Sequence, residues 1–171
     1  MDLTRISDFT RVRTTNSTDA TYPSRVPTLT EPTGNGVVEM AAIAGEMPSH
    51  LLMVPYATGP SNATFRSRMI GWRRLLSTTG VALWLPVILG EFACTLGTTV
   101  GVSGGAISTG ERMVDTLTLN VGNANVSVEV VSPANDTIAH AVIDAKGFAK
   151  LEFLFEIVAS TTDMNALIAR L

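Results

Sequence analysis

Apolar and polar residues alternate most clearly in two neighbouring stretches near residue 120. From Leu117 to Val121 every second residue is apolar, and residues 126–131 alternate in the same way. A Gly/Asn turn separates the two stretches. Period-two alternation around such a turn is typical of a β-hairpin. The pattern therefore predicts paired strands over Val114–Val121 and Val126–Val131.

A second hairpin is predicted over Ile138–Asp144 and Phe148–Val158. The later strand sends Leu151, Phe153, Phe155 and Ile157 to one face. Its other face carries Glu152 and Glu156 with Leu154 between them. Because an apolar residue lies on the polar face, we expect this face to be partly covered as well.

A third hairpin is predicted over Thr64–Leu75 and Val81–Leu89, which flank a Ser/Thr/Gly turn. Phe92–Val100 is predicted as a further strand. Val37–Ala44 and Leu51–Tyr56 are predicted as edge strands.

The last residues, Thr162–Leu171, fit either a helix capped by Thr162 or Asp163 or one more strand. Roughly eight to ten short, regularly spaced strands are typical of a sandwich or barrel. We therefore predict an all-β fold, with a β-sandwich or jelly-roll-like body over residues 36–171.

Residues 1–35 differ from the rest of the chain. They hold nine threonines together with Pro23, Pro27 and Pro32. Prolines at this spacing exclude a helix and favour extended chain. The few apolar residues in this segment cannot form a core of their own. We predict an extended N-terminal arm that is either disordered or ordered against a neighbouring subunit.

The chain is poor in charge. Charged residues make up 16% of it and hydrophobic residues 46%, whereas about 25% charged is usual for a soluble domain. Interfaces are depleted of charge, so part of the surface is expected to be covered by partners; the alternative is a compact monomer with a Ser/Thr/Asn surface. The net charge of −3 argues against a nucleic-acid binder. Four arginines, Arg66, Arg68, Arg73 and Arg74, are expected to face solvent or neighbouring carboxylates.

Residues 75–110 carry one charge, Glu91, and are long enough to span a bilayer. However, they contain Pro86 and several glycines, and their longest apolar run, Val81–Leu89, is too short to span. We therefore predict buried strands and no membrane association. The first 13 residues are rich in charge and lack the apolar core of a signal peptide.

Residues for catalysis or metal binding are scarce. Cys94 is the only cysteine and is expected to be buried and inert. His50 and His140 are the only histidines, which is a poor inventory for a metal site. Gly101–Gly105 matches the letters of a nucleophile elbow, but no helix pattern follows. We predict no enzyme, no catalytic, cofactor-binding or metal residues, and no cofactor.

Two further groups of residues have alternative interpretations. Glu152 and Glu156 would lie about 13 Å apart on one strand, too far for paired carboxylates of a glycosidase, so a solvated or interfacial face is expected. Tyr56, Trp72 and Trp84 could form a sugar-stacking platform, which requires an exposed tryptophan. A core role for both tryptophans is the alternative that the low aromatic content favours.

Several segments between Asn62 and Leu171 resemble small structural proteins of tailed bacteriophages. They are Thr64–Arg74 with Leu83–Pro86, the strand and Gly-aromatic step of Ala141–Phe148, and the Thr/Ala/Asn-rich tail of Ser160–Ala166. The resemblance implies a β-sandwich or jelly-roll fold, symmetric oligomers and no cofactor.

The resulting hypothesis is a virion structural protein assembled in the host cytoplasm. A capsid decoration or cement protein that stabilises the head fits best, as a homo-oligomer with a trimer favoured, bound to the major capsid protein or another virion protein. A tail or head–tail connector component is a variant. A carbohydrate-binding β-sandwich is an alternative of another class.

Overall fold

The structure is a computed structural model that describes residues 10–13, 30–33, 36–40, 50–101, 107, 109–122, 128–131 and 138–170. Within these residues the regular elements are ten strands. They are β1 (Thr10–Arg13), β2 (Val37–Glu39), β3 (His50–Thr58), β4 (Thr64–Leu76), β5 (Ala82–Val100), β6 (Glu111–Gly122), β7 (Val128–Val131), β8 (His140–Asp144), β9 (Lys150–Ala159) and β10 (Thr162–Arg170).

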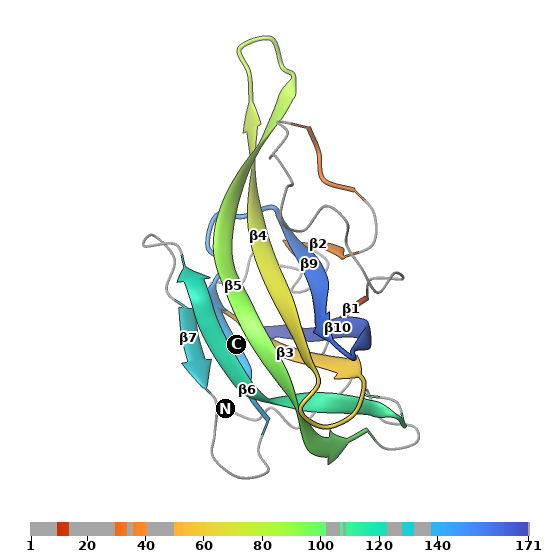
Figure 1. Ribbon diagram of the computed structural model, residues 1–171. Coiled ribbons are helices and arrows are strands. Elements are labelled where there is room, and N and C mark those ends of the chain that lie inside the picture. The colour runs from red at the N-terminus through yellow and green to blue at the C-terminus, as the bar shows by residue number, and fades with distance from the viewer. Residues whose placement is uncertain are drawn as a thin grey trace.

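All ten strands belong to one antiparallel sheet that curls into a half-barrel (Figure 1). The main strand order is β1-β10-β3-β6-β5-β4-β9-β2. β3 pairs with β8 through its first half and with β6 through its last residues, and β7 pairs with β8. The predicted all-β, sandwich-like fold is confirmed.

One hydrophobic core fills the concave side of the sheet. Side chains from both ends of the strand order meet there, Phe65 and Phe153 from β4 and β9, and Met53 and Ile168 from β3 and β10. Strand alternation selects them, because only every second residue points inward. Curling of the sheet thus buries both halves against each other.

The predicted hairpin of β4 and β5 is confirmed and is longer than expected. The two strands pair from Thr64↔Thr95 to Leu76↔Ala82, with one irregularity between Met69 and Ile70. The strands predicted over Val81–Leu89 and Phe92–Val100 form a single strand of 19 residues. In Figure 1 the turn end of this hairpin projects well beyond the rest of the molecule.

Two predicted hairpins are wrong. β7 pairs with β8 instead of β6, and β8 and β9 pair with β3 and β4 instead of each other. The strands themselves are present, because alternation along the sequence identifies a strand and its buried face. Alternation does not identify the partner strand, which the curl of the sheet selects.

The position predicted for Leu51–Tyr56 is also wrong, because β3 is a central strand. It lies between β10 on one side and β8 and β6 on the other. Its apolar residues are buried on both faces, in the main core and in a second cluster that contains Leu52, Tyr56 and Leu167. A continuous apolar run is typical of a strand buried on both faces.

The ends of the sheet agree better with the sequence. β2 is an edge strand as predicted, but it covers only Val37–Glu39; Met40 lies beyond its end, and the rest of that prediction, residues 41–44, lies outside the described residues. The C-terminal segment, left open between helix and strand, is strand β10. Among the described residues, no helix is long and apolar enough to cross a membrane.

Part of the predicted arm contacts the body directly. β1 pairs with β10. Lys150 Nζ donates to the Pro32 carbonyl. Residues 14–29 lie outside the described residues, and the domain boundary at residue 36 stays a prediction.

Candidate interaction surface

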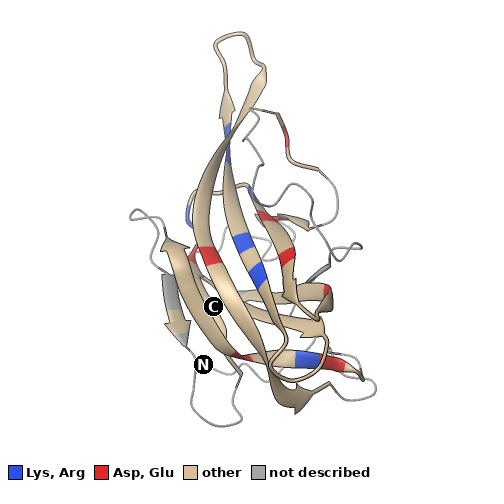
Figure 2. Cartoon of the chain, viewed as in Figure 1, with Lys and Arg blue, Asp and Glu red and all other residues tan. Residues whose placement is uncertain are grey.

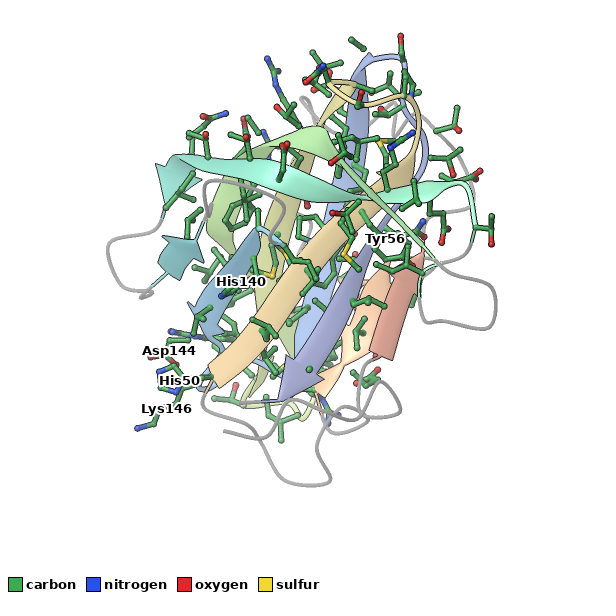
Figure 3. The ribbon with its side chains drawn as sticks, turned by 90° about the horizontal axis from the view of Figure 1, so that it is seen from below. His50, Tyr56, His140, Asp144 and Lys146 are labelled. Carbon is green, nitrogen blue, oxygen red and sulfur yellow. The ribbon has the colours of Figure 1, made fainter. Side chains whose placement is uncertain are left out.

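The two histidines lie at opposite ends of β8, since His140 is its first residue and His50 of β3 lies across from its last residue. His50 is the register partner of Asp144, and the backbone amide of Lys146 donates to Asp144 Oδ1 at 3.0 Å. Figure 3 shows these three residues together at one corner, apart from Tyr56. His140 Nδ1 lies 3.2 Å from the Ile138 carbonyl oxygen. The described residues contain no cluster of three or more His, Cys, Asp or Glu that could hold a metal.

The proximity of His50 and Asp144 could not be predicted from the sequence. Nothing in the local sequence pairs His50 with Asp144, because their pairing depends on β3 meeting β8. His50 is exposed to solvent and Asp144 is half-buried, and the relation between them is the backbone register of the two strands. We therefore place no function there.

The other candidate side chains are buried within the protein. Cys94 is inaccessible, and burial raises the pKa of its thiol far above the ordinary range, so it stays protonated. Trp72 and Trp84 are 1% and 5% exposed, and Tyr56 is fully buried. The sugar-stacking alternative required an exposed tryptophan, and both Trp72 and Trp84 are buried.

Glu152 and Glu156 have different surroundings, contrary to the expectation of one solvated or interfacial face. Glu152 is 2% exposed and its Oε2 accepts from the indole nitrogen of Trp72 at 2.9 Å. Glu156 is partly exposed and lies 3.4 Å from Arg66. Leu154 is buried beside Trp72, so this face is covered as predicted.

Lys150 is the centre of a charged cluster on the convex side. Its Nζ lies 2.7 Å from both Glu31 and Glu39 and 5.1 Å from the centroid of the Trp84 ring. Burial alone would lower the pKa of Lys150, but its hydrogen bonds to the two carboxylates and their charges raise it above the ordinary value. A cavity of about 370 Å³ adjoins this cluster, and Arg74 also lines it.

The four arginines of β4 divide into two groups. Arg66 and Arg68 face carboxylates on neighbouring strands of the same chain, and Arg68 Nη2 lies 2.7 Å from Glu91. Arg73 and Arg74 are exposed, and the guanidinium of Arg73 lies over the Phe148 ring at 5.0 Å. Both stand at the root of the projecting hairpin.

The projecting hairpin is a two-stranded ribbon, which we define as residues 73–89. β4 pairs with β9 only as far as Trp72↔Lys150, and β5 pairs with β6 only from Gly90↔Gly122. Beyond these points the two strands pair only with each other among the described residues. We expected this segment to be buried strands; that prediction is wrong for Leu75, Leu76, Val81 and Ile88, which are exposed, and is confirmed for Trp84 and Leu89, which are buried.

Apolar side chains remain exposed along this ribbon. Leu75, Leu76 and Val81 are 48%, 68% and 60% exposed, and Ile88 is also exposed. The sequence carries no charged residue from Leu75 to Gly90. In Figure 2 the ribbon is correspondingly uncoloured beyond its arginine root. The ribbon is therefore the best candidate for an interaction surface.

The sequence matches no protein-family model, no curated protein and no solved structure.

Proposed function

We propose that this chain is a phage virion structural protein, a capsid decoration protein that acts by assembly and carries out no catalysis. The ribbon is the observation that supports this proposal most directly. Scattered exposed apolar residues are normal, but exposed apolar residues concentrated on one element, which carries no charge beyond Arg74, are typical of an interaction site. The charge-poor composition and the resemblance of Thr64–Arg74 and Ala141–Phe148 to phage structural proteins point in the same direction.

The half-barrel suits a rigid shell component. Its core is continuous, and the described part of the arm is held on the body by β1 and by Lys150. Such a body leaves the ribbon as the element free to reach a neighbour. A tail or head–tail connector component would use the same surface and is the variant to be distinguished.

Location in the particle tests the proposal. Phage particles whose genome encodes this chain would be purified on a density gradient and labelled with an antibody against it. We expect the protein to co-sediment with particles and the label to decorate heads. Label on tails would support the connector or tail variant, and protein found only in the soluble fraction would contradict the virion proposal.

A further inference from the structure

The cavity beside Lys150 is continuous with one face of the ribbon. Cross-strand partners share a face of a sheet, so Arg74 lies on the same face as its partner Trp84. Leu76 and its partner Ala82 lie two positions further along the ribbon and share that face. Arg74, Ala82 and Trp84 line the cavity, whose volume is about 370 Å³. We call Arg74, Leu76, Ala82 and Trp84 the cavity face of the ribbon.

Lys150 has no hydrogen-bond donor left for a ligand in this cavity. An ammonium group has three N–H donors. In Lys150 they meet the carboxylates of Glu31 and Glu39 and the carbonyl oxygen of Pro32. The same bonds occupy one oxygen of each carboxylate. Recognition of a ligand therefore depends on the other polar groups of the cavity.

Arg74 and Trp84 have donors that are still unused. A guanidinium has five N–H donors, and Arg74 is exposed and has no hydrogen bond or ion pair among the described residues. The indole nitrogen of Trp84 likewise has no acceptor in the described part of the chain, although the residue is only 5% exposed. Two unused donors on neighbouring positions favour an acceptor as the ligand, and a negatively charged acceptor binds a guanidinium most strongly.

The charge of the cavity favours a carboxylate over a phosphate. Among the described residues, two positive side chains (Arg74 and Lys150) and two negative ones (Glu31 and Glu39) line it, so their charges cancel. A carboxylate adds a single negative charge beside Arg74. The second charge of a phosphate would meet the two glutamates, and like charges that face each other oppose binding.

Leu76 favours a segment of a protein over a free small molecule. It is 68% exposed, more than any other large hydrophobic residue in the described part of the chain. A molecule confined to the cavity would leave Leu76 in water, whereas a polypeptide can cover it and also reach Arg74. Two positions along a strand span about 7 Å. The partner must therefore present an apolar side chain and a carboxylate at that spacing, as residues two positions apart in an extended segment do.

We infer that the cavity face binds an extended segment of a partner protein in which an apolar residue and an aspartate or glutamate lie two positions apart. The carboxylate accepts hydrogen bonds from Arg74, and the apolar side chain packs on Leu76 and Ala82. The inference rests on the assembly function proposed above and names the chemistry of the partner. Because Trp84 beside this ion pair is buried, salt screens the pair less than it screens an exposed one.

A pair of short peptides tests the site in the full-length chain. The probe is acetyl-Thr-Leu-Thr-Glu-Thr-amide, and its control carries Gln in place of Glu. Binding is followed through the indole N–H signals in NMR spectra, where Trp72, hydrogen-bonded to Glu152, is the internal control. We expect the Glu peptide to shift the Trp84 signal and leave the Trp72 signal in place. The Gln peptide should bind about tenfold more weakly, because it lacks the charge-assisted hydrogen bond.

The two adjacent arginines provide matched variants. Arg74→Gln should abolish the preference for the Glu peptide. Arg73→Gln removes the same charge from the opposite face, because Arg73 is the register partner of Leu85, and it should keep the tenfold preference. Leu76→Ser should weaken binding of both peptides by the same factor, since each carries the same apolar residue.

Several outcomes would overturn the inference. These are an unmoved Trp84 signal, equal binding of the two peptides, or a preference that Arg73→Gln removes as fully as Arg74→Gln. Acetate that shifts the Trp84 signal at the concentration of the Glu peptide would show a site for any free carboxylate and would overturn the partner segment.

The peptide experiment and the virion experiment fail separately. A protein that co-sediments with particles but binds neither peptide keeps its virion function and loses this site. A protein that binds the Glu peptide as expected but never co-sediments with particles keeps the site, and the virion function fails.

Discussion

At the scale of single residues, the most consequential group is the Lys150 ammonium. It links an N-terminal part of the chain to a C-terminal part, because its partners Glu31 and Glu39 precede β3 whereas Lys150 begins β9. The lysine is nearly buried, but the side chains of both glutamates are more than half exposed. Solvent screening therefore weakens each pair, and the value of the cluster lies in fastening residues 30–39 onto the sheet.

Replacing Lys150 with Met should lower the free energy of unfolding at pH 8 by about 1–2 kcal/mol, between the values for exposed pairs and for hydrogen bonds to charged groups. Methionine is apolar and close to lysine in length but lacks the ammonium, so the loss covers the two ion pairs, the hydrogen bond to the Pro32 carbonyl and the contact of Nζ with the Trp84 ring. Urea denaturation followed by tryptophan fluorescence measures it. Lys146→Met, at the exposed second lysine, is the control and should change little.

The same residue gives a dependence on pH. The pKa of Lys150 in the folded protein lies above its ordinary value of 10.5, so the folded state holds this proton more tightly than the unfolded state. Its contribution is complete below pH 10.5 and is lost as the pH rises through the folded-state pKa. The difference in unfolding free energy between wild type and Lys150→Met should therefore shrink above pH 10.5. A difference that grows there would contradict this account.

At the scale of elements, Gly71 determines how the ribbon leaves the body. A Cβ at this position would lie 2.6 Å from Cδ1 of Phe148, too close for any contact between carbon atoms. Phe148 is buried and also lies under the Arg73 guanidinium. Because Gly71 has no side chain, the Phe148 ring can pack against β4 at the position where the ribbon begins.

Gly71→Ala should destabilise the protein by about 1–3 kcal/mol, the usual penalty for overpacking a core. Thermal unfolding followed by circular dichroism measures the loss. The Gly71→Ala/Phe148→Leu double variant is the control. Its loss should be smaller than the sum of the two single losses, because the smaller side chain relieves the clash. Additive losses would show that Phe148 is not the group that Gly71 accommodates.

At the scale of the whole molecule, charge and apolar surface are separated. Ion pairs lie on the body, whereas the ribbon beyond its root has none among its residues (Figure 2). Binding of a partner protein through such a ribbon would be driven by removing apolar surface from water. Salt screens interactions between charges, so it should have little effect on a contact made by the uncharged part of the ribbon.

Binding to the particle through the ribbon should therefore be insensitive to salt. Between low and high sodium chloride we expect the amount of this protein that co-sediments with purified particles to change by less than about threefold, because screening weakens mainly exposed charge pairs. Sedimentation over a salt series measures it. A large loss of co-sedimentation at high salt would place the contact on the charged body instead of the ribbon.

Strands and their buried faces could be predicted from the sequence. The hairpin of β4 and β5 was also predicted correctly, whereas the same cue of adjacent strands joined by a short turn was wrong for β6 with β7 and for β8 with β9. Partner choice was not predictable where strands distant in sequence meet, as β9 with β4 and β8 with β3. Alternation shows only which side of a strand is apolar. Many different neighbouring strands are compatible with the same apolar side.

The candidate site shows the same division. The sequence by itself determined that residues 75–90 are apolar and free of charge, and that the chain offers few groups for catalysis. Only the tertiary structure decided that this segment projects into solvent, because β9 and β6 stop pairing at Trp72 and Gly90. An apolar stretch has the same composition in a core and on an exposed ribbon, and its surroundings depend on which distant strands reach it.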